Sequence, residues 1–229
     1  MVRRLLLATI WIGFLGYILW LAPLDQPFTW SFAHNLVTLQ WGEVNAYLMV
    51  IFWMMGVWPM IYACLMFADG QTQPFPSWPF FVVSNLVGVI GLIPYLLVRQ
   101  RNSAFSGKKD FWLDLLDRRS TGVALLLTTL MLFTIAVTVG DWNDYVTQFR
   151  SYAFVHLISL DFCLMGLIFP LTSLIDDDMQ RRGVYRTERV WAIALVPLFG
   201  PLIYLCWRPA LLNLPSTQET LSNGFSRAL

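Results

Sequence analysis

The sequence predicts an all-α protein, a polytopic transmembrane helix bundle of about six spans. Only 13% of its 229 residues are charged, 57% are hydrophobic, and the mean hydropathy is +0.60. A soluble domain carries roughly twice that share of charged residues. We therefore expect a single transmembrane domain over residues 1–229. Six stretches without Lys, Arg or Glu approach or exceed the roughly 20 helical residues that cross about 30 Å of hydrocarbon, and they are residues 5–22, 44–68, 79–98, 121–139, 153–175 and 190–206.

The basic residues concentrate in two loops. Loop 99–120 carries six Lys and Arg residues, and loop 176–189 carries four. With six spans these loops lie on one side, which the positive-inside rule assigns to the cytoplasm. Both termini would then face away from the cytoplasm, although Arg3 and Arg4 argue for the opposite. The net charge of +1, without a basic tract, predicts no nucleic-acid partner.

A short amphipathic helix is predicted between the third and fourth stretches. Residues 110–117 place Phe111, Trp112, Leu115 and Leu116 at helical spacing, with acids on the other face. This pattern is typical of a helix that lies in the membrane interface. A solvated connector is the alternative.

Part of the first half of the sequence recurs in the second half. Three polar residues repeat with a spacing of 109, so that Asp69, Tyr95 and Arg99 match Asp178, Tyr204 and Arg208. The match predicts a duplicated three-span unit, with halves 1–100 and 118–210 joined by the linker 101–117. Because each copy has an odd number of spans, the halves would form a 3+3 inverted repeat, as in many transporters. A chance match of residues that are common in membrane helices is the alternative.

Two ionisable residues lie inside the predicted fifth span. Asp161 is eight residues from its start and His156 is three. A charged side chain in hydrocarbon is costly, so both are candidate catalytic residues, with Asp161 as a general acid. The alternatives are a structural hydrogen bond between helices for Asp161, and an interfacial histidine bonded to backbone or a lipid headgroup for His156.

Breaks in the third and sixth spans suggest a central pocket. Gly88, Gly91 and Pro94 interrupt the third span, and the segment from Pro197 to Pro201 interrupts the sixth. Paired broken helices are typical of walls around a site in the membrane, while close packing through small residues is the alternative. The Tyr and Arg residues at the ends of these two spans, Tyr95 and Arg99 and then Tyr204 and Arg208, are also explained by side chains that reach from the span toward the membrane surface. The expected substrate-binding residues are Tyr95, Pro201, Tyr204 and Arg208.

The acidic run Asp176–Asp178 stands beside Arg181 and Arg182. Carboxylates suit a divalent cation, but adjacent acids diverge on a helix, so a solvated, self-neutralising cap is favoured. The three cysteines lie apart, and no metal site is expected. The sequence leaves any cofactor open.

Two resemblances bear on function. Residues 153–208, with His156, Asp161, the acidic run and the Gly200-Pro…Tyr204…Arg208 segment, are similar to a pattern of the neoxanthin synthase-like membrane protein family of plants and cyanobacteria. The first half resembles an uncharacterised multi-pass membrane protein family of cyanobacteria and chloroplasts, through residues 56–62 and the segment from Pro79 to Tyr95. These resemblances imply a thylakoid or plasma membrane, and a carotenoid or other isoprenoid as substrate.

Three functions remain open at this point, and the sequence does not decide whether the protein is an enzyme. The first is acid/base chemistry on an isoprenoid or carotenoid within the bilayer. The second is a non-enzymatic accessory or assembly subunit of a photosynthetic membrane complex. The third is a small transporter. Membrane lipids are expected partners in each case.

Overall fold

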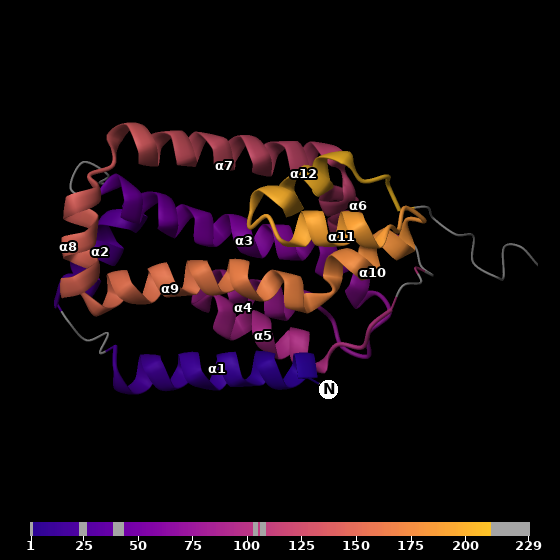
Figure 1. Ribbon diagram of the computed structural model, residues 1–229, viewed down its shortest axis with the longest axis horizontal. Coiled ribbons are helices and arrows are strands. Elements are labelled where there is room, and N and C mark those ends of the chain that lie inside the picture. The colour runs from indigo at the N-terminus through magenta and orange to yellow at the C-terminus, as the bar shows by residue number, and fades with distance from the viewer. Residues whose placement is uncertain (1, 23–26, 39–43, 103–104, 106–108, 212–229) are drawn as a thin grey trace, which may run out of the picture.

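The computed structural model describes residues 2–22, 27–38, 44–102, 105 and 109–211, which form helices and loops without a strand (Figure 1). The all-helical fold class is confirmed. In chain order the elements are α1 (Val2–Trp20), α2 (Pro27–Val37), α3 (Ala46–Gly70), α4 (Trp78–Val87), α5 (Val89–Val98), α6 (Phe111–Asp117), α7 (Arg119–Val139), α8 (Trp142–Ser151), α9 (Ala153–Ile168), the 3-10 helix η2 (Phe169–Thr172), α10 (Leu174–Arg181), α11 (Thr187–Ala194) and α12 (Phe199–Trp207).

Four helical segments are long and apolar enough to cross a bilayer. They are α1, α3, α7 and the continuous α9–η2 segment, with 19, 25, 21 and 20 residues. A helix satisfies its own backbone hydrogen bonds, which hydrocarbon requires. The helices α1 and α7 lie at the outer edges, and α3 and α9 lie between them (Figure 1). The chain is therefore a membrane-embedded helical bundle.

The predicted third span is a hairpin of two short helices, α4 and α5. The chain reverses at Gly88, whose φ of +61° favours glycine. Across the hairpin, the ring centroids of Phe80 and Tyr95 lie 5.6 Å apart. Each arm has 10 residues and reaches only about 15 Å, which is half of the hydrocarbon thickness. This segment therefore enters the bundle and returns.

The predicted sixth span is a second hairpin, formed by α11 and α12. Its turn is at Leu198, with a φ of +65°. The Arg189 guanidinium lies 5.1 Å from the centroid of the Trp207 ring, so the outer ends of both arms meet. In each hairpin a glycine after the turn, Gly91 or Gly200, packs so closely on the opposite arm that a Cβ would not fit. The expectation of six single-helix spans therefore holds for four segments and not for these two.

The two hairpins change which ends of the chain lie together. The start of α1, both hairpin bases, α6 and α10 lie at one end of the bundle, here called the polar end, whereas α2 and α8 lie at the opposite end (Figure 1). Among the described Lys and Arg residues, Arg150 is the one that belongs to α2 or α8. The expectation that the N-terminus faces away from the basic loops is wrong, because Arg3 bonds to Ser173 and Arg4 bonds to the Arg99 carbonyl.

The two halves of the bundle have the same order of elements. A long helix, a short helix at the opposite end, a second long helix and a hairpin make up α1–α5, and the same series recurs in α7–α12 with η2 and α10 inserted. Both halves start and finish at the polar end (Figure 1). The halves therefore run in the same direction, which differs from the inverted arrangement that the sequence predicts.

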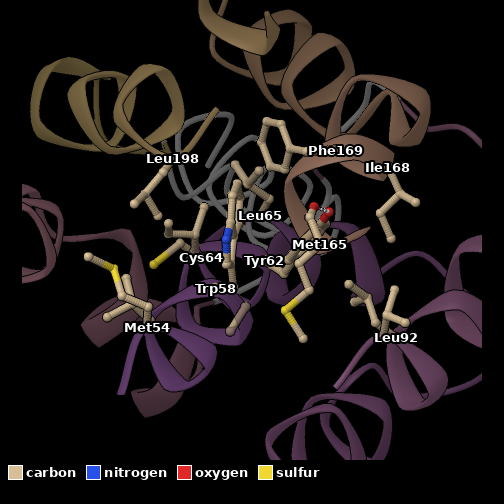
Figure 2. Close-up of a cluster of buried hydrophobic side chains, with 14 of the residues drawn as sticks. Met54, Trp58, Tyr62, Cys64, Leu65, Leu92, Met165, Ile168, Phe169 and Leu198 are labelled. Carbon is tan, nitrogen blue, oxygen red and sulfur yellow. Dashed lines mark hydrogen bonds between the residues drawn. The ribbon is translucent and has the colours of Figure 1, made fainter. Parts of the chain in front are cut away.

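The helix α3 forms the centre of the core and packs on α4, α7 and α9. Figure 2 shows Trp58 and Tyr62 of α3 near Phe169 of η2, and the ring of Phe169 lies 5.9 Å and 5.4 Å from theirs. The Tyr62 hydroxyl donates a hydrogen bond to the Met165 carbonyl over 2.8 Å. These buried contacts join the second long helices of the two halves.

Candidate functional site

The polar end contains a buried network of carboxylates and guanidinium groups. In the first half, Asp69 lies at the end of α3, and Tyr95 and Arg99 lie one turn apart at the end of α5. Tyr95 Oη donates a hydrogen bond to Asp69 Oδ2 over 2.6 Å, and Arg99 donates to both carboxylate oxygens at 2.8 and 2.6 Å. The side chains of Asp69 and Arg99 are fully buried. These contacts fix the base of the first hairpin to the end of α3.

Asp178 of α10 receives the equivalent contacts in the second half. Tyr204 Oη donates to Asp178 Oδ2 over 2.8 Å, and Arg208 Nη1 donates to the same oxygen over 3.2 Å. Arg182, the residue directly after α10, donates a further hydrogen bond from Nε to Asp178 Oδ2 over 2.9 Å. The residues that match at a spacing of 109 therefore make matching contacts.

The two sets of contacts are joined to each other. Arg181 Nη2 lies 2.7 Å from Asp69 Oδ1, and Arg181 Nη1 lies 3.7 Å from Asp178 Oδ1. Arg99 reaches across in the other direction, with Nη2 at 2.6 Å from Asp177 Oδ2. The network therefore ties the two halves together at the polar end.

The neighbouring cations lower the pKa of two buried acids, Asp178 and Asp117. Burial acts to raise the pKa of Asp178, but Arg182 and Arg208 outweigh it and lower this pKa to about 2. At Asp117, burial is likewise outweighed by Arg182 and Lys109, and the pKa is lowered; each of these two cations lies 2.7 Å from an Asp117 oxygen. Breaking a buried pair by removing one partner typically costs about 3–5 kcal/mol.

The acidic run is part of this network, and the interpretation as a solvated cap is wrong for two of its three members. The helix α10 turns Asp177 and Asp178 inward, and only Asp176 keeps partial exposure, at 20% of its side chain. Arg101 pairs with both Asp176 and Asp177. Among the described residues, no group of three or more His, Cys, Asp or Glu side chains is arranged to hold a metal ion.

The four expected substrate-binding residues are buried in the protein. Tyr95, Tyr204 and Arg208 belong to the network, and Pro201 lies in the first turn of α12, where a proline is tolerated because early helical N–H groups lack a helical partner. The interruption predicted for the segment from Pro197 to Pro201 is the turn at Leu198. None of the four lines either of the two pockets described below.

Asp161 lies at the tip of the first hairpin. Its Oδ1 accepts a hydrogen bond from the Val89 backbone N–H over 2.8 Å, at the start of α5. A Cβ on Gly88 would overlap this carboxylate, so only glycine allows such a close approach. Its Oδ2 is buried and has no hydrogen-bond partner within the described chain. In this position Asp161 caps a helix end inside the bundle.

His156 lies apart from Asp161. Its Nδ1 shares a hydrogen bond with the Tyr17 hydroxyl of α1, and its ring lies 4.4 Å from the Phe149 ring of α8. The two expected catalytic residues therefore have separate surroundings. The sequence offers a bond to backbone or to a lipid headgroup for His156 and does not indicate this contact with Tyr17.

A pocket of about 820 Å³ lies beside the base of the first hairpin. Its walls come from the end of α3, the following loop, α4 and α6, and we call it the aromatic pocket. Trp78 and Trp112 are mostly exposed, at 59% and 61%. Gln71 and Asp110 supply polar groups. The lining residues are Phe67, Gly70, Gln71, Gln73, Pro74, Phe75, Pro76, Ser77, Trp78, Phe81, Val82, Asp110 and Trp112.

Comparisons of the chain with protein-family models, with curated proteins and with solved structures found no match. The sequence does not indicate that Asp177 faces inward, that Asp117 pairs with Arg182, or which residues form the walls of the aromatic pocket. The equal spacing of Asp, Tyr and Arg in the two halves is the sequence feature that indicates members of the network.

Proposed function

We propose that the protein is a membrane-embedded binding protein for an isoprenoid with a polar ring, the class that includes hydroxylated carotenoids. The observation that carries the proposal is the aromatic pocket. Its volume of about 820 Å³ falls in the range of small-molecule sites, and its walls combine aromatic rings with a few polar groups.

The position of the pocket suits an amphipathic ligand. Trp78 and Trp112 stand at the polar end, where aromatic residues are typical of the membrane interface. An end ring stacks on aromatic side chains, a hydroxyl on that ring bonds to Gln71 or Asp110, and the polyene tail extends along the lipid-facing side of α4. The sequence resemblance of residues 153–208 to the neoxanthin synthase-like family implies the same class of ligand.

Binding of pigment by the full-length protein in lipid nanodiscs tests this proposal. A dihydroxylated carotenoid should co-purify with the wild type, and a hydrocarbon carotenoid should bind more weakly because it leaves the polar groups unpaired. Trp112→Ala should weaken binding about 5–10-fold through loss of one stacking wall. Trp30→Ala is the matched control, because Trp30 is 74% exposed in α2 at the opposite end. Equal pigment content in all three proteins would refute the proposal.

Acid/base chemistry at Asp161 is the second candidate function. The buried Oδ2, which has no hydrogen-bond partner among the described residues, favours it, since a protonated carboxyl oxygen there has a proton to donate. Asp161→Asn retains an acceptor for the Val89 N–H and removes the acid. Altered pigment composition in cells that carry this variant, with the protein still inserted, would favour chemistry; an unchanged composition would favour binding alone.

We also propose that the polar end faces the cytoplasm and that the two halves arose by duplication. The positive-inside rule supports the cytoplasmic orientation, because with four crossings and two re-entrant hairpins nearly all described Lys and Arg residues lie at the polar end. The shared order of elements and the matched contacts of Asp69 and Asp178 support the second. The duplicated unit in this proposal has two spans and one hairpin and is not inverted.

A further inference from the structure

We propose that the polar end carries a binding site for the phosphate group of an anionic membrane lipid, separate from the aromatic pocket. A cavity of about 950 Å³ lies between α1, α5 and the start of α10, and we call it the arginine pocket. Its basic side chains are Arg3, Arg4 and Arg101, and its apolar wall includes Leu5 and Leu97.

Two of these guanidinium groups bond only to neutral acceptors. Arg3 Nη1 donates to Ser173 Oγ at 2.7 Å and to the Thr172 carbonyl at 3.4 Å, and Arg4 Nη2 donates to the Arg99 carbonyl at 3.2 Å. Within the described ranges, neither guanidinium lies within 4.0 Å of a carboxylate, in contrast to the arginines of the buried network. Their positive charge is therefore available to an anion, and guanidinium groups match phosphate oxygens in geometry.

The start of α7 provides an internal comparison. Arg119 donates to the backbone at the end of α12 over 3.0 Å, as Arg4 does at the end of α5. The residue before it, Arg118, forms an ion pair with Asp114 at 2.6 Å, whereas Arg3 has no such acid. Arg118 is therefore neutralised by an acid, whereas its counterpart Arg3 bonds to neutral acceptors among the described residues.

The shape of the arginine pocket favours a lipid over a free phosphate ion. A free ion would contact only the basic part of the cavity. Leu5, which is 59% exposed, and Leu97 form a wall that continues along α1 toward the lipid-facing surface. A phospholipid places its phosphate on the arginines and its glycerol backbone and acyl chains along this wall. Basic pockets between membrane helices are known to hold such headgroups.

The test uses purified, delipidated full-length protein in a neutral detergent. Three probes are titrated by calorimetry: dihexanoyl phosphatidylglycerol, dihexanoyl phosphatidylcholine and inorganic phosphate. We expect phosphatidylglycerol to bind at least 10-fold more tightly than either other probe. Arg3→Gln should weaken its binding about 10-fold, and the exposed Arg4→Glu should weaken it further by charge reversal. Arg118→Gln is the matched control and should leave the affinity within twofold.

Each other outcome overturns the proposal. Equal binding of phosphatidylcholine would remove the requirement for an anion, and equal binding of inorganic phosphate would identify a free-ion site. Unchanged affinity in both pocket variants, or an equal loss in Arg118→Gln, would place the lipid elsewhere. Thermal unfolding of each variant verifies folding, and Arg4→Glu keeps the test valid if Arg3→Gln is unstable, because Arg4 is exposed.

Discussion

Gly88 is the residue on which the tip of the first hairpin depends. Its φ of +61° costs an L residue about 1–2 kcal/mol, and a Cβ there would overlap the Asp161 carboxylate. We expect Gly88→Ala to lower the free energy of unfolding by about 2–5 kcal/mol, because strain and overpacking add. Equilibrium unfolding in detergent measures this loss.

A second glycine separates the two effects. Gly183 has a similar φ of +66°, but a Cβ there would meet nothing within 4 Å. Gly183→Ala should therefore cost only the backbone part, about 1–2 kcal/mol. Equal losses in the two variants would contradict the close approach of Asp161.

Asp178 should make stability depend on acid pH. Its pKa in the folded protein is lowered from 3.8 to about 2, so its stabilising effect is fully present above about pH 5 and is lost as the pH falls through 4 toward 2. The difference in unfolding free energy between wild type and Asp178→Asn should shrink by about 2 kcal/mol between pH 5 and pH 2. Thermal unfolding across this range measures it, and a constant difference would contradict the ionised state.

At the level of elements, the two hairpins should be anchored equally. Tyr95 and Tyr204 each donate a hydrogen bond from the end of a hairpin to a buried carboxylate, at 2.6 and 2.8 Å. Tyr95→Phe and Tyr204→Phe should each cost about 1–3 kcal/mol, the value of a hydrogen bond to a charged group. Unfolding in detergent compares them. A large loss in one variant and none in the other would show that only one hairpin relies on this contact.

The hairpins are also the elements that sequence reasoning could not predict. Residues 79–98 have the length and hydropathy of a span, because composition records a preference for hydrocarbon and not the direction of the chain. The reversal of the chain at Gly88 is held by two distant contacts. Asp161 bonds to Val89, which is 72 residues away in the sequence, and Asp69 bonds to Tyr95 at the base of the hairpin. In contrast, α1, α3, α7 and α9 were predictable, since an uninterrupted apolar helix has no other stable arrangement in a bilayer.

The candidate site was predictable only in part. The spacing of 109 identified Asp69, Tyr95 and Arg99 together with their counterparts, but not that the two groups touch. That contact arises because both hairpins return to one end, which the six-span expectation excluded. The aromatic pocket combines walls from α3, α4 and α6, and no local pattern in the sequence brings these three elements together.

For the whole molecule, the proposed orientation predicts a labelling pattern. Asn143 is exposed in α8 at the opposite end, and Arg186 is exposed at the polar end. In a variant without Cys163, a membrane-impermeant maleimide added to intact cells should label Asn143→Cys and spare Arg186→Cys until the cells are opened. The reverse pattern would invert the proposed orientation.

The bond between Asp161 and Val89 has a consequence for how the chain is made. The first hairpin precedes α9 in the chain, so its tip is synthesised before the carboxylate that caps it. Until then the exposed N–H groups at the start of α5 must stay near water, at the membrane surface. We therefore expect the first half of the protein to reach its final depth only after the second half is made, because Asp161 is the side chain that caps the hairpin tip.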